Sequence, residues 1–82
     1  MLNIYVGNLP FIATDAELQE AFSAHGTVNA ATVITDRETG RPRGFGFVEM
    51  ENDTEGEAAI EALNGSDMGG RTLVVNKARP KR

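Results

Sequence analysis

Short runs in which hydrophobic and polar residues alternate recur along this chain, and a period of two predicts β-strands. The runs are residues 2–6, 28–35, 43–50 and 72–78. One side of these strands carries the aliphatic residues expected to face a core: Leu2, Ile4, Val6, Ala31, Val33, Val48, Met50, Leu73 and Val75. The other side carries Asn3, Tyr5, Thr32, Ile34, Phe45, Phe47, Val74 and Asn76.

A helix is predicted between the first two strands, because a capping signal precedes a helical stripe. Thr14 is followed three residues later by Glu17, which is the spacing of a capping box. The apolar stripe that follows is Leu18, Ala21 and Phe22. Gly26 is expected to end the helix. His25 then lies in the last turn, where we expect a structural role because no catalytic partner accompanies it.

A second helix is predicted after the third strand, with Asn52 or Asp53 as its N-cap. Its apolar stripe is Ala59, Ile60 and Leu63, and Asn64-Gly65 ends it. Gly56 is unexpected inside this helix, because glycine costs about 1 kcal/mol relative to alanine there. Either Gly56 lets the helix pack closely on the sheet, or the helix begins after it.

The resulting order is β-α-β-β-α-β, the ferredoxin-like α+β pattern. In it, two helices cover one face of a four-stranded antiparallel sheet and leave the other face open. Polar loops are expected at residues 36–42, with a turn at Thr39-Gly40, and at residues 66–70. The 82 residues are expected to form one domain, residues 1–79, with a short basic tail at residues 80–82. We expect the chain to be mobile from Arg79 onward.

The third strand is ambiguous by hydrophobicity alone, since phenylalanines lie on one side and aliphatic residues on the other. Burying the two rings would also bury Arg43 or Glu49, and an unpaired buried charge is costly. A slip of one residue would reverse the two faces. We place Phe45 and Phe47 on the open face with Tyr5, where an exposed aromatic patch predicts a binding site. Unpaired bases suit such a patch, because any base can stack on an aromatic ring.

The formal net charge of −4 and the isoelectric point of about 4.8 argue, taken alone, against a nucleic-acid ligand. Most of the Lys and Arg residues are clustered, however, at two places: Arg37, Arg41 and Arg43, and then Lys77, Arg79, Lys81 and Arg82. The acidic residues gather in the predicted helices. A negatively charged molecule can therefore still present a positive field on one face.

Composition excludes several kinds of site. The chain has no cysteine, so disulfides and thiolate chemistry are absent, and its single histidine excludes a zinc site built from Cys and His. No apolar stretch approaches the roughly 20 residues that span a bilayer, and the chain begins with a strand-like run rather than a secretory leader. We expect a cytoplasmic protein with no cofactor, no metal site and no membrane partner.

Two segments resemble the signatures of the RNA recognition motif family. Residues 4–9, Ile-Tyr-Val-Gly-Asn-Leu, resemble its first-strand hexamer. Residues 43–50, Arg-Gly-Phe-Gly-Phe-Val-Glu-Met, resemble its third-strand octamer, which begins K/R-G-F/Y-G/A-F-V. The resemblance covers almost the whole chain, including residues 36–40 and 70–78. It is strongest to small bacterial and cyanobacterial proteins that consist of little more than one such domain.

The resemblance implies RNA-binding roles for individual residues. Tyr5 and Phe45 match rings that stack under successive bases, Phe47 matches a ring beside the sugars, and Arg43 matches a cation that pairs with phosphate. Further candidates complete the open face, the neighbouring loop and the end of the fourth strand: Asn3, Thr32, Ile34, Arg41, Asn76, Lys77, Ala78 and Arg79. The expected function is binding of single-stranded RNA in post-transcriptional regulation, with single-stranded DNA bound more weakly, by a monomer.

Two other classes of function remain open. A protein-interaction domain of this fold would use its acidic helices to dock a partner, typically with the sheet aromatics lost or covered. An enzyme would need an activated group, but the sequence offers no nucleophile–base pair, no metal cluster and no phosphate-cradling loop. Gly44 and Gly46 lie inside a strand, so they do not form a dinucleotide motif.

Overall fold

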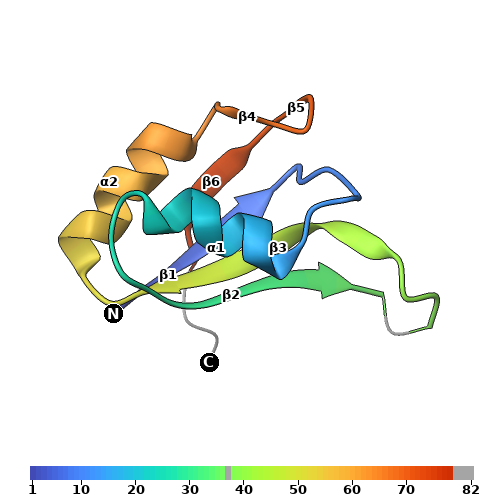
Figure 1. Ribbon diagram of the computed structural model, residues 1–82, viewed down its shortest axis with the longest axis horizontal. Helices are drawn as coiled ribbons and strands as arrows, with labels where there is room; N and C mark the ends of the chain where they lie inside the picture. The colour runs from blue at the N-terminus through green and yellow to red at the C-terminus, as the bar shows by residue number, and fades with distance from the viewer. Residues whose placement is uncertain (37, 79–82) are drawn as a thin grey trace.

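The structure is a computed structural model that describes residues 1–36 and 38–78, with the backbone alone at residues 42 and 43. Figure 1 shows the predicted order of elements with one addition, a short hairpin of two strands after the second helix. The strands and helices are β1 Leu2–Gly7, α1 Asp15–Ser23, β2 Val28–Thr35, β3 Pro42–Met50, α2 Asp53–Leu63, β4 Asp67–Met68, β5 Arg71–Thr72 and β6 Val74–Lys77. The mobile tail predicted from Arg79 onward lies outside the described residues.

The main sheet has four strands in the order β2-β3-β1-β6, and neighbouring strands are antiparallel. Both helices lie on the same face of this sheet (Figure 1). The predicted ferredoxin-like α+β architecture is therefore confirmed. The opposite face of the sheet carries neither helix.

The core lies between the sheet and the helices, and it confirms the alternation read from the sequence. Ile4, Val6 and Phe22 are completely buried. The buried apolar residues are Ile4, Val6, Leu9, Ala13, Leu18, Phe22, Val48, Met50, Ala59, Leu73 and Val75. At about 25 cal/mol per Å² of apolar surface, burial of these side chains is the main force that holds the helices on the sheet.

The start of α1 is as predicted and its end is not. Thr14 caps the helix through a complete capping box with Glu17. The helix ends at Ser23, so the prediction that Gly26 would end it was wrong. The turn closes instead through a bond from the His25 N–H to the Phe22 carbonyl at 3.0 Å. Short-range bonds of this kind satisfy the last carbonyls of a helix without a left-handed glycine.

The second helix begins at its predicted cap. The Asn52 side chain accepts from the Glu55 N–H at 3.0 Å, so α2 starts at Asp53 and includes Gly56. A Cβ at Gly56 would lie 2.6 Å from Leu2 Cδ2. Close packing on β1 therefore explains this glycine, and the late helix start considered above was wrong.

Residues 66–70, predicted to be a loop, include part of a small hairpin. β4 pairs with β5 through a two-residue connection in which Gly69 and Gly70 have φ of 57° and 86°. Positive φ at both positions is the requirement of the tight hairpin turns that favour Gly-Gly. The fourth strand predicted at residues 72–78 is correspondingly divided at Leu73. The Leu73 N–H donates to the Ser66 carbonyl at 2.8 Å and thus leaves the main ladder.

Candidate nucleic-acid interface

One row of cross-strand neighbours runs across the open face from edge to edge. Tyr5 on β1 pairs in register with Phe47 on β3 and with Asn76 on β6. Phe47 pairs in turn with Thr32 on β2. Because neighbours in register on one face have Cβ atoms about 4.5–5.5 Å apart, the four side chains form a continuous strip. Two aromatic rings lie at its centre, with a polar side chain at each end.

Phe45 completes a compact cluster of three rings. The centroid of its ring lies 5.9 Å from that of Tyr5 and 6.0 Å from that of Phe47. The Tyr5 and Phe47 centroids are 5.9 Å apart, with an angle of 64° between the planes. Offset and edge-on pairs at these distances are the favourable arrangements of aromatic rings. The three rings therefore stabilise one another's positions, and the Phe47 residue remains 40% exposed.

Gly7 lets the Tyr5 ring lean along its own strand. A Cβ at Gly7 would lie 2.7 Å from the Tyr5 hydroxyl oxygen and 2.9 Å from Tyr5 Cε2. Gly7 pairs in register with Phe45 and Val74, so this ring covers the backbone between them. Val74, which is 45% exposed, was placed on the open face by the alternation but was not among the candidate binding residues.

A second row lies beside the rings. Asn3 pairs in register with Glu49, and its carbonyl accepts from the Ala78 N–H at 2.8 Å. Asn3 and Ala78 thus lie next to each other. Glu49 brings a negative charge to the same row, where it disfavours a phosphate.

The remaining candidates are Ile34, Arg41, Arg43 and Arg79. Ile34 is half-buried where the β2–β3 register shifts, between Val33 and Thr35. Arg41 is exposed in the β2–β3 loop, and its carbonyl accepts from the Asp36 N–H at 2.7 Å. The Arg43 side chain and all of Arg79 lie outside the described part of the chain.

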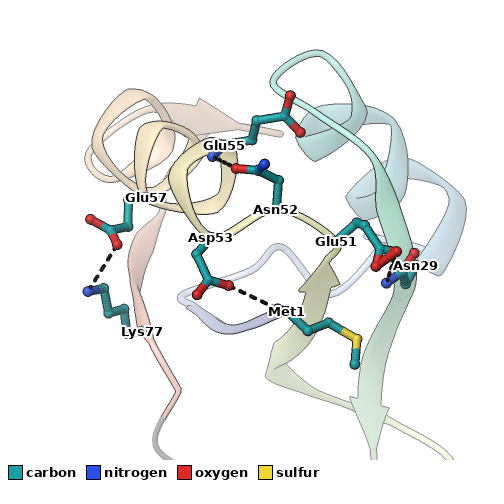
Figure 2. A network of polar contacts seen from close by, with 8 residues as sticks. All are labelled: Met1, Asn29, Glu51, Asn52, Asp53, Glu55, Glu57 and Lys77. Atoms are coloured by element: carbon teal, nitrogen blue, oxygen red, sulfur yellow. Dashed lines mark hydrogen bonds and ion pairs between the residues drawn. The ribbon is translucent and has the colours of Figure 1, made fainter.

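Lys77 is not beside the rings. It pairs in register with Ile4, a core residue, so its side chain leaves β6 on the side that the helices cover. Its Nζ lies 3.6 Å from a carboxylate oxygen of Glu57 on α2 (Figure 2). The prediction that grouped Lys77 with the candidate RNA-binding residues does not fit this geometry. The reason is the alternation itself, since Asn76 faces outward and the next residue must face the other way.

Within residues 1–36 and 38–78, no three His, Cys, Asp or Glu side chains gather in a way that could hold a metal ion. The described helices include none that combines the length and apolar character needed to cross a membrane.

Comparison with known proteins identifies the family signature. The sequence model of the RNA recognition motif family matches residues 4–74 of this chain. RbpE of Nostoc sp., whose RNA binding is inferred, is 54% identical to this chain over 80 residues. These residues are 98% of this chain and 81% of RbpE. RbpA of Synechocystis sp., also with RNA binding inferred, is 54% identical over 98% of this chain and 79% of its own length.

Solved structures agree with this match. The crystal structure of the RNA-binding protein PG1 superimposes with a TM-score of 0.93 at 48% identity, over 99% of this chain and 100% of that one. A complex of the Sxl-lethal protein with RNA gives a TM-score of 0.87 at 39% identity, over 94% of this chain and 47% of that one.

Proposed function

This chain belongs to the RNA recognition motif family, and we propose that it binds single-stranded RNA by stacking bases on Tyr5, Phe45 and Phe47. The observation that carries the proposal is the cluster of three rings on the face of the sheet without helices, with centroids 5.9–6.0 Å apart. The three rings on this face are not part of the core cluster. They match the π-face that every unpaired base presents.

Stacking supplies most of the affinity. Base–aromatic stacking contributes about 1–3 kcal/mol per base, and the cluster accommodates about two or three bases. With a few phosphate contacts this gives a dissociation constant on the order of micromolar. Arg43 is the candidate phosphate partner, because it precedes the ring-bearing residues on β3.

Base identity is read by the polar ends of the central row. Thr32 and Asn76 flank the two rings in register, and both are exposed. Asn3 adds an amide in the next row. Hydroxyl and amide groups can donate to and accept from the edges of splayed bases and the 2′-hydroxyl, which favours RNA over single-stranded DNA.

The same surface predicts a strong preference for unpaired RNA. A double helix stacks its bases on one another and offers only phosphates and 2′-hydroxyls to the rings. We expect a single-stranded octanucleotide pool to bind at least about fivefold more tightly than duplexes of the same length, since one lost stack alone is worth about 1–3 kcal/mol. Fluorescence anisotropy with labelled RNA at fixed salt measures both affinities. Equal affinities would mean that the protein binds phosphate alone and would contradict the proposal.

Lys77 and its neighbour Asn76 provide a test of which side of β6 meets RNA. We expect Lys77→Ala to change RNA affinity by less than about twofold, because its side chain leaves β6 on the helix-covered side and forms only a surface ion pair with Glu57 there. Asn76→Ala removes a hydrogen bond of about 0.5–1.5 kcal/mol from the ring row and should weaken binding by about 2–12-fold. Titrations of both variants with the same RNA show which side of β6 binds it. A larger loss for Lys77→Ala would place RNA against the edge of α2.

A wider role completes the proposal. We place the binding domain at residues 1–79, with residues 80–82 as a short basic tail. The protein acts by binding rather than by catalysis, in post-transcriptional regulation of RNA, and it does so as a cytoplasmic monomer. The matches to RNA-binding proteins over nearly the whole chain support RNA binding as the basis of this role.

A further inference from the structure

A carboxylate lies on the open face of the sheet, beside the aromatic rings. Glu49 follows Phe47 by two positions on β3, so both side chains leave the strand on the same face. Glu49 pairs in register with Asn3 on β1 and with Ala30 on β2. The row that contains Glu49 therefore runs directly beside the central row of rings.

The surroundings of Glu49 leave its carboxylate open to a ligand. Glu49 is half-buried, whereas Asn3 and Ala30 on either side of it are exposed, and Ala30 places only a methyl group beside the carboxylate. Within the part of the chain that the structure describes, neither ion pair involves Glu49. A half-buried carboxylate is stabilised by hydrogen-bond donors, and a ligand can supply them here.

A carboxylate discriminates between bases because it accepts hydrogen bonds and donates none. The Watson–Crick edge of guanine presents two adjacent donors, N1–H and N2–H, which match both carboxylate oxygens at once. The same edges of adenine and cytosine combine one amino donor with a ring-nitrogen acceptor, and uracil places its N3–H between two carbonyl oxygens. An acceptor of the base that faces an acceptor of the protein is left unpaired, so a carboxylate favours guanine.

The spacing of the two rows lets a stacked base reach Glu49. Residues two positions apart on a strand are separated by about 6.7 Å, and diagonal neighbours on adjacent strands by about 7–8 Å. A base stacked on Tyr5 spans part of this distance, and a hydrogen bond of about 2.9 Å spans the rest. Asn3 lies across from Glu49, where its amide can donate to the O6 atom of the same guanine. The charge of Glu49 repels phosphate, which turns the RNA backbone away from this row and a base edge toward it.

We infer that Glu49 makes the open face selective for guanine in the RNA that it binds. This inference rests on the proposed function. The carboxylate accepts from N1–H and N2–H of a guanine that is stacked on the neighbouring ring, and Asn3 donates to O6. Hydrogen bonds to a charged acceptor are about twice as strong as neutral ones, so this residue contributes more to base choice than the hydroxyl and amide groups of the central row.

The base preference of the full chain tests this inference. Four labelled RNA octamers are titrated by fluorescence anisotropy: octauridine, and octauridine with one central base replaced by G, A or C. We expect the G octamer to bind about 5–150-fold more tightly than octauridine, which is the discrimination given by one good bidentate pair. Glu49→Gln should reduce this ratio to below about threefold, because an amide offers one donor and one acceptor and can pair with every base. Loss of folded protein would lower all four affinities alike and leave the ratio unchanged.

Glu61→Gln is the matched control, because it removes the same charge from α2, on the helix-covered side of the sheet. It should leave the ratio as it is in the unaltered protein. The inference is overturned if that protein binds the G octamer no more tightly than the other three. It is also overturned if Glu49→Gln raises all four affinities equally, because Glu49 would then only repel phosphate. Phe45→Ala separates the two proposals: it should weaken the binding of all four octamers, and if it weakens none, the proposed function fails.

Discussion

Replacing Phe45 and Phe47 together by alanine is expected to abolish RNA binding in the micromolar range while the fold remains intact. The two rings lie on the open face. Each substitution removes one ring on which a base can stack, and one base–aromatic stack is worth about 1–3 kcal/mol. The combined loss of about 2–6 kcal/mol corresponds to a factor of about 30 to more than 10⁴ in affinity. Phe47 is 40% exposed, so its removal leaves no closed cavity in the core. Fluorescence anisotropy across a salt series measures the loss.

Val74→Ala is the matched control for this double variant, because Val74 is 45% exposed on the same face and carries no ring. Its effect should stay within about threefold, the value of a few methyl contacts. Circular dichroism and thermal melting establish that the double variant is folded. If the folded double variant keeps its affinity at low salt and loses it at high salt, phosphate contacts alone bind RNA and the stacking mechanism is wrong.

Phe22→Ala is expected to cost the fold about 3–5 kcal/mol of unfolding free energy, as for other large-to-small substitutions in cores. Phe22 is completely buried and is the largest side chain among the core residues. A domain of this size has a total stability of about 4–12 kcal/mol, so the variant loses a large part of it. It should be partly unfolded at physiological temperature and bind RNA poorly for that reason. Urea unfolding followed by circular dichroism gives the change in free energy.

Phe11→Ala makes the same chemical change at a residue that is 65% exposed. Its cost should stay below about 1 kcal/mol, because little apolar surface returns to water and no cavity forms. A cost for Phe22→Ala below that of Phe11→Ala would show that the helix-covered side of the sheet is not the principal core.

Much of the fold was predictable because its signals are local. The alternation of Ile4 and Val6 with Tyr5 follows from the two-residue period of a strand, and the burial of the two aliphatic residues confirms it. The start of α1 at its capping box depends on residues only three positions apart. The Gly69-Gly70 hairpin was missed, although that dipeptide is itself a turn signal. Its strands of two residues each are too short to show any alternation.

The sequence by itself determined which side chains can stack on bases and on which face of its own strand each one lies. The tertiary structure decided which of them meet. Register between strands brought Thr32, Phe47 and Tyr5 into one row, and the packing of α2 on the sheet placed Glu57 beside Lys77. The approach of β5 to the end of β1 placed Arg71 over Phe11. Such contacts join residues up to about sixty positions apart, and they depend on the packing of whole elements, for which no short stretch of sequence carries a signal.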